Sequence, residues 1–134
     1  MGSRGQYMES RRFVLRFESH YHKVGEIEGV KILEFNARPN SALPEYAKTA
    51  DAYISRNGKG EMLHLRVFEA HEPILEFDVG HWKHYGKEKG YVHVHDYSKD
   101  ANGFPVRITP GRDPSAAELA RYGTILRHMR GSLA

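Results

Sequence analysis

Short runs in which apolar and polar residues alternate recur along the chain, and this period of two predicts β-strands. The clearest runs are residues 29–36 and 61–70, which are rich in β-branched and aromatic side chains. Further strands are expected at residues 11–18, 52–56, 74–79, 91–97 and 104–109. Residues 19–28 are polar and contain Gly25, so the pattern predicts a connection there.

A tight turn is predicted at residues 57–60, Asn-Gly-Lys-Gly, because two glycines supply the positive φ angles that hairpin turns require. The preceding segment, residues 45–55, fits two structures. Its end fits the first strand of this hairpin, but Tyr46, Ala50 and Tyr53 also recur at a helical spacing. The sequence favours the hairpin and leaves the choice between helix and strand open.

The C-terminal region predicts an amphipathic helix. Pro114 suits the first turn of a helix, and Ser115 with Glu118 three residues later forms a capping-box pattern. Apolar side chains then recur on one side of the predicted helix, at Leu119, Tyr122, Ile125, Leu126 and Met129. We expect this stripe to pack on the sheet.

These elements predict a single α+β domain over residues 8–134. We expect an antiparallel, meander-like sheet of five to seven strands, with the C-terminal amphipathic helix packed on one face and the other face partly open. Residues 1–7 are small and polar and precede a second methionine, so we expect a vector-derived or disordered segment there. The length of 134 residues suits one domain, and 40% hydrophobic residues provide for a packed core.

Composition excludes several classes of protein. With 0 Cys, the chain has no disulfide, no thiolate nucleophile and no cysteine-bound zinc, which favours the cytoplasm. No run approaches the roughly 18 apolar residues of a membrane-spanning helix, so no membrane partner is expected. The net charge of +3 is too small to mark a nucleic-acid-binding protein by itself, so any anion site must be local.

Histidine is the unusual feature of the composition, with 9 residues. Four of them, His81, His84, His93 and His95, lie on either side of a glycine-rich loop. A His-x-His pair on a strand directs both imidazoles to one face, about 7 Å apart along the chain. We therefore place the site on the open face of the sheet. That face would carry Tyr91, His93, His95 and Tyr97.

Acid–base chemistry is the leading hypothesis for this site. Histidine titrates near neutral pH, and two histidines acting as base and acid can cleave RNA through its own 2′-hydroxyl. His93 and His95 are the expected pair, assisted by His81 or His84. Cationic side chains would bind phosphate and aromatic ones would stack on bases, and the candidates are Trp82, Lys83, Tyr91, Tyr97 and Arg107. The predicted function is a small phosphodiesterase or ribonuclease-like protein that binds RNA or another phosphate-containing ligand.

Two alternatives remain open. Neutral imidazole also binds divalent metals such as zinc, and the candidate ligands are His81, His84, His93, His95 and Asp96. The same face could instead be a non-catalytic surface for a protein partner or a second copy of the chain. Histidines on a strand also serve purely structural roles, so the sequence does not decide whether the protein is an enzyme.

The second half of the chain contains three segments in this order: RVFEAHEPILEFDVGHW, GYVHVHDY and NGFPVRITPGRDPSAAELARYG. Their order resembles uncharacterised proteins of phages, prophages and related mobile elements, in which a His-bearing loop precedes a His-x-His-Asp strand and a segment ending in Tyr-Gly. The resemblance covers under half of the chain. It implies a bacterial cytoplasm and a genomic setting like that of small nuclease toxins, and it carries no assigned activity.

Overall fold

The computed structural model describes residues 21–35, 43–44, 46–79 and 92–130. The elements are β1 (Tyr21–Ile27), β2 (Val30–Phe35), β3 (Ala52–Arg56), β4 (Met62–Glu69), β5 (Glu72–Asp78), β6 (His93–Lys99), β7 (Pro105–Arg107) and α3 (Ala116–Arg130). The predicted strand at residues 11–18, the segment 1–7 and the loop at 80–90 lie outside the described residues.

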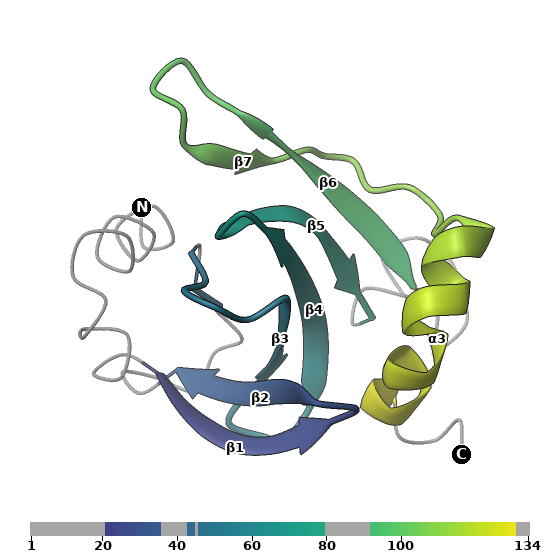
Figure 1. Cartoon of the computed structure of the whole chain (residues 1–134). Helices are drawn as coiled ribbons and strands as arrows, with labels where there is room; N and C mark the ends of the chain where they lie inside the picture. The colour runs from purple at the N-terminus through teal and green to yellow at the C-terminus, as the bar shows by residue number, and fades with distance from the viewer. Residues whose placement is uncertain (1–20, 36–42, 45, 80–91, 131–134) are drawn as a thin grey trace.

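The strands form one seven-stranded sheet in the order β1-β2-β3-β4-β5-β6-β7, with α3 on one of its faces (Figure 1). The predicted α+β class is confirmed. Neighbouring strands are antiparallel except for β2 and β3, which are parallel, so the prediction of a purely antiparallel meander is wrong at this pair. Parallel neighbours need a crossover connection rather than a tight turn, and residues 36–51 provide the chain length for it.

Strand β1 occupies residues for which the sequence pattern predicts a connection, and that prediction is wrong. β1 pairs with β2 in a hairpin whose turn places Glu28 and Gly29 at φ angles of 52° and 81°. Tyr21 is buried, and its ring lies 5.2 Å from that of Phe35. Several other side chains of β1 are exposed because it is an edge strand, which explains its polar sequence.

The hairpin interpretation of residues 45–55 is confirmed, since Ala52–Arg56 is β3 and pairs antiparallel with β4. The side chain of Asn57 stabilises the turn, because its Oδ1 accepts hydrogen bonds from the backbone N–H groups of Lys59 and Glu61. Gly60 has a φ of 82°, as the glycine pattern of this turn requires.

An apolar row crosses five strands of the sheet. Cross-strand pairing places Ile32, Ile54, Leu65, Phe77 and Val94 side by side, and each is at most 8% exposed. Helix α3 covers this apolar row, and the side chains that it contributes to the same core are Ile125, Leu126 and Met129.

The predicted apolar stripe of α3 is wrong at its first position. Leu119 is 46% exposed, and packing against the core begins one turn later with Tyr122. Its ring lies 5.4 Å from that of Phe77 in the apolar row. In the described part of the chain, no helix is long and apolar enough to cross a membrane.

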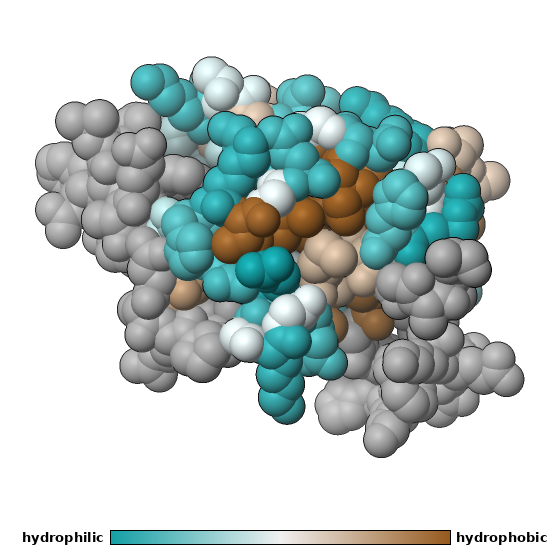
Figure 2. All heavy atoms as spheres, turned by 90° about the horizontal axis from the view of Figure 1, so that it is seen from below, coloured by the Kyte–Doolittle hydropathy of each residue, from teal (hydrophilic) through white to brown (hydrophobic). Residues whose placement is uncertain are grey.

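The opposite face of the sheet carries a second apolar cluster. Leu33 and Tyr53 point to this face because side chains alternate along a strand, and Leu43, Ala47 and Phe68 pack with them. Apolar side chains also reach the surface of the molecule, as the view from below shows (Figure 2).

Charged side chains hold the start of α3. The predicted capping box is confirmed, since the backbone N–H of Ser115 donates to Glu118 at 2.8 Å and that of Glu118 donates to Ser115 Oγ at 3.1 Å. Arg112 donates to the carboxylates of both Asp96 and Glu118 at 2.7–2.9 Å. The hydrogen bond from Arg112 lowers the pKa of Glu118 from 4.5 to about 2. The network therefore ties α3 to β6 over a wide range of pH.

Replacing Glu118 should flatten the acid end of the stability profile. Its pKa is lower in the folded than in the unfolded protein, so its contribution is complete above about pH 4.5 and is lost as the pH falls to about 2. Urea denaturation between about pH 5 and pH 2 measures this contribution, which Glu118→Gln should remove. Glu69→Gln, at an exposed position on β4, is the control for the loss of one carboxylate. Identical pH dependence of the free energy of unfolding in the two variants would contradict the lowered pKa of Glu118.

Candidate metal centre

Two polar rows run beside the apolar row. One places Ser55, His64, Asp78 and His93 side by side across β3 to β6, and the other does the same for Tyr53, Arg66, Glu76 and His95. Because side chains alternate, both polar rows lie on the face opposite α3. The members of these rows on β4, β5 and β6 form what we call the polar cluster: His64, Arg66, Glu76, Asp78, His93 and His95.

Most of the polar cluster is buried. Glu76, Asp78, His93 and His95 are 2%, 0%, 1% and 4% exposed. The prediction of an open face is therefore wrong for this part of the sheet. Two pieces of backbone lie against it: Arg66 donates to the carbonyl oxygens of residues 43–44, and the backbone of residues 108–112 contacts the histidines.

Glu76 is the hydrogen-bonding centre of the polar cluster. Its carboxylate accepts hydrogen bonds from Arg66 at 2.7 Å, Arg107 at 3.2 Å and the Tyr97 hydroxyl at 3.3 Å, and His64 Nδ1 lies 3.4 Å away. Burial alone would raise the pKa of Glu76, but the charge of Arg66 and the contact with His64 outweigh it and hold the pKa well below its usual range. Glu76 is therefore a charged group that two arginines neutralise.

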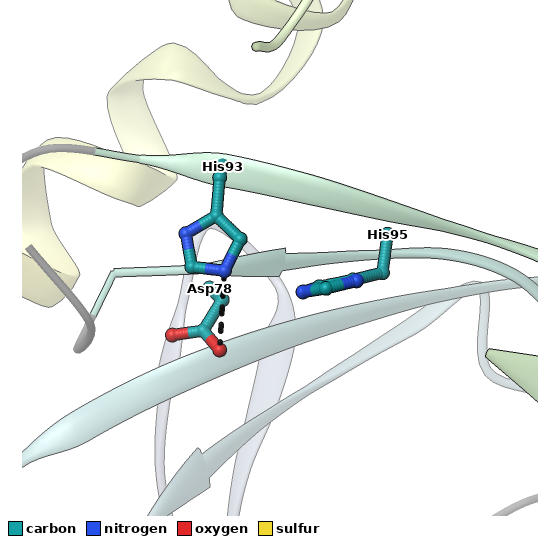
Figure 3. A group of neighbouring side chains, drawn as sticks. All are labelled: Asp78, His93 and His95. Carbon is teal, nitrogen blue, oxygen red and sulfur yellow. Dashed lines mark ion pairs between the residues drawn. The ribbon is translucent and has the colours of Figure 1, made fainter. Parts of the chain in front are cut away.

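Asp78, His93 and His95 form the group that we call the ligand triad. Each offers one ligand atom, and these atoms all lie within 4.8 Å of one another. Figure 3 shows the Asp78 carboxylate and the His93 and His95 rings close together on the face of the sheet that points away from α3. His93 Nε2 lies 3.7 Å from Asp78 Oδ2, and the two imidazole rings are 4.9 Å apart. His64 Nδ1 lies 3.6 Å from the same Asp78 oxygen on its other side.

A backbone contact selects the tautomer of His95. Its Nδ1 lies 2.8 Å from the carbonyl oxygen of Ile108. A carbonyl can only accept a hydrogen bond, so Nδ1 carries the proton and the neutral ring presents a lone pair at Nε2. Metal-binding histidines in proteins are commonly oriented by this same kind of contact.

Residues 108–112, which we call the strap, are fixed to β6 at both ends. The N–H of Ile108 donates to the carbonyl of Asp96 at 2.8 Å. Arg112 exchanges backbone hydrogen bonds of 2.7 and 2.8 Å with Val94. Between these points the strap lies close to the rings: a Cβ at position 111 would lie 2.7 Å from His93 Cδ2, so the ring or the strap would have to move.

The structure brings some of the predicted site residues together and separates others. His93 and His95 meet as predicted, and Tyr97 and Arg107 lie beside them through their contacts with Glu76. Asp96 is a correction to the predicted ligand set, because it points to the other face and binds Arg112. The remaining predicted residues lie outside the described part of the chain: His81, Trp82, Lys83, His84 and Tyr91.

Sequence reasoning missed Asp78 as a site residue, together with Glu76, His64 and Arg66. The usable signal was a polar-apolar-polar triplet in each of three strands: His64-Leu-Arg66, Glu76-Phe-Asp78 and His93-Val-His95. Alignment of the three triplets about their central apolar residues would have placed the carboxylates beside the imidazoles.

The chain matches no model of a known protein family, no curated protein and no solved structure. The geometry of the polar cluster is thus the basis for a functional assignment.

Gly111→Ala should destabilise the protein by disturbing the histidines. The new Cβ would also lie 3.0 Å from the Val94 carbonyl oxygen, so the strap would have to move, and we expect a loss of about 1–3 kcal/mol in the free energy of unfolding. Urea denaturation gives this value. Gly123→Ala is the matched control: its nearest contact would be 3.6 Å within α3, so it should raise stability by up to about 1 kcal/mol. An unchanged free energy of unfolding in Gly111→Ala would contradict the close contact of residue 111 with His93 and Val94.

Proposed function

We propose that the protein binds a divalent transition-metal ion through Asp78, His93 and His95. The observation that carries this proposal is the convergence of three buried ligand atoms within 4.8 Å, two from β6 and one from β5. Ligand atoms around one ion with bonds near 2 Å lie about 3 Å apart, so small side-chain rotations would complete the site. The tautomer of His95 also favours coordination through Nε2.

The donor set limits which ion is expected. Two imidazoles and one carboxylate suit zinc or iron(II), whereas magnesium and calcium prefer oxygen ligands. Three protein ligands leave coordination positions for water or a substrate, and this is typical of catalytic rather than structural sites. A metal held in this way can activate a bound water and stabilise developing negative charge.

Metal-free cleavage of RNA by His93 and His95 stays a prediction, and the burial of these rings favours the metal instead. An acid–base pair must contact both the 2′-hydroxyl and the leaving oxygen of the RNA, but the two rings are only 1% and 4% exposed, so a polynucleotide chain has no access to both of them. Burial likewise weighs against the alternative of an exposed interaction surface at this position. We also propose a bacterial mobile element as the source and the cytoplasm as the location, on the order of the three segments in the second half of the chain.

The full chain should contain a near-stoichiometric metal. Elemental analysis after purification, followed by titration of the metal-free protein with zinc and with iron(II), measures this directly. We expect Asp78→Asn and the double variant His93→Ala with His95→Ala to lose the ion, with affinity at least about 100-fold lower, because each removes a ligand.

Controls separate ligand loss from unfolding. The double variant His22→Ala with His128→Ala removes two exposed histidines and should keep the metal. Asp78→Asn nearly preserves the shape of the side chain, and circular dichroism reports whether each variant folds. A wild-type protein without metal, or equal binding by both double variants, would refute the proposal. An RNA-cleavage assay on the same samples tests the acid–base hypothesis.

A further inference from the structure

Arg107 connects the buried polar cluster with the surface. It projects from β7, and its Nη1 donates to Glu76 on β5 at 3.2 Å. β6 lies between these two strands, so the side chain crosses β6 on the face that carries His95 and Tyr97. The Arg107 side chain is 38% exposed, whereas that of Glu76 is 2% exposed. The guanidinium therefore extends from solvent to the strand that carries a proposed metal ligand.

The formal charges of the two arginines and two carboxyl groups at this site cancel only while no metal is bound. Arg66 and Arg107 provide two positive charges, and Glu76 and Asp78 provide two negative ones, so the sum is zero with neutral histidines. A divalent ion on the ligand triad would raise the sum to two positive charges. Burial makes an excess of this size costly unless an anion compensates it.

We infer that the metal-loaded site binds a small dianion, a phosphate monoester or a dicarboxylate, with one oxygen on the metal and another on Arg107. This inference rests on the proposed function, because the ion supplies the excess charge. The contact with Glu76 uses one terminal nitrogen of Arg107, and a guanidinium has five N–H donors in a fork that matches the oxygens of phosphate and carboxylate groups.

The same features disfavour a phosphodiester. A diester carries one negative charge and would leave half of the excess uncompensated. RNA binding also relies on extended basic and aromatic surfaces. In the described residues, by contrast, the ligand triad is buried and Arg107 is the exposed arginine bonded to the polar cluster.

Cobalt(II)-loaded full-length protein, titrated with inorganic phosphate, malonate and dimethyl phosphate, tests this inference through its visible absorption and by calorimetry. Phosphate or malonate should bind and change the cobalt spectrum, and dimethyl phosphate should bind at least about tenfold more weakly. Arg107→Ala should weaken dianion binding by about tenfold or more, and Arg107→Lys by less, because lysine keeps the charge without the fork. Lys99→Ala, which removes an exposed cation of β6 paired with Glu72, should have no effect.

The outcomes distinguish this inference from the proposed function. Equal cobalt binding by all variants, with dianion affinity weakened most in Arg107→Ala, less in Arg107→Lys and not in Lys99→Ala, supports both. The relative affinities for phosphate and malonate identify the class of dianion. Full cobalt binding with no dianion binding, or with affinity that is unchanged in Arg107→Ala or equal for dimethyl phosphate, overturns the inference and leaves the metal site standing. Absence of cobalt binding in the wild type overturns both.

Discussion

Cross-strand register decides which side chains meet in this protein. Ile32, Ile54, Leu65, Phe77 and Val94 are paired across five strands, and burying each of them under α3 is worth about 1.5–3 kcal/mol. A slip of one residue in any pair would turn an apolar side chain to the other face and a polar one to the core. The geometry of the polar cluster is thus set by residues that take no part in its chemistry.

The two buried carboxylates of the polar cluster have different partners and, we argue, different roles. Glu76 lies between Arg66 and Arg107, which are permanently charged, so its charge is compensated without a further ligand. Asp78 lies between the imidazoles of His64 and His93 at 3.6 and 3.7 Å. Imidazole is positive only when protonated, but it binds metals when neutral. A carboxyl group with such neighbours suits the metal-ligand role proposed for Asp78.

Local patterns in the sequence were enough to predict elements whose contacts are local. The hairpin at Asn57–Gly60 and the cap of α3 at Ser115 depend on residues within four positions of each other, and both were predicted. The direction of β3 relative to β2 depends on a long crossover, so no local pattern encodes it. The pairing of His93 and His95 follows from the period of two, but the third ligand, Asp78, comes from a neighbouring strand and required the register of β5 against β6.

The strap links the start of α3 to the ligand triad through one short piece of backbone. Ile108 holds the ring of His95, and four residues later Arg112 holds Asp96 and Glu118. Because both ends of the strap are hydrogen-bonded to β6, a displacement of the backbone at Arg112 would also displace the Ile108 carbonyl that fixes the tautomer of His95. The helix cap and the orientation of the His95 ring therefore share one short piece of backbone, although they lie on opposite faces of the sheet.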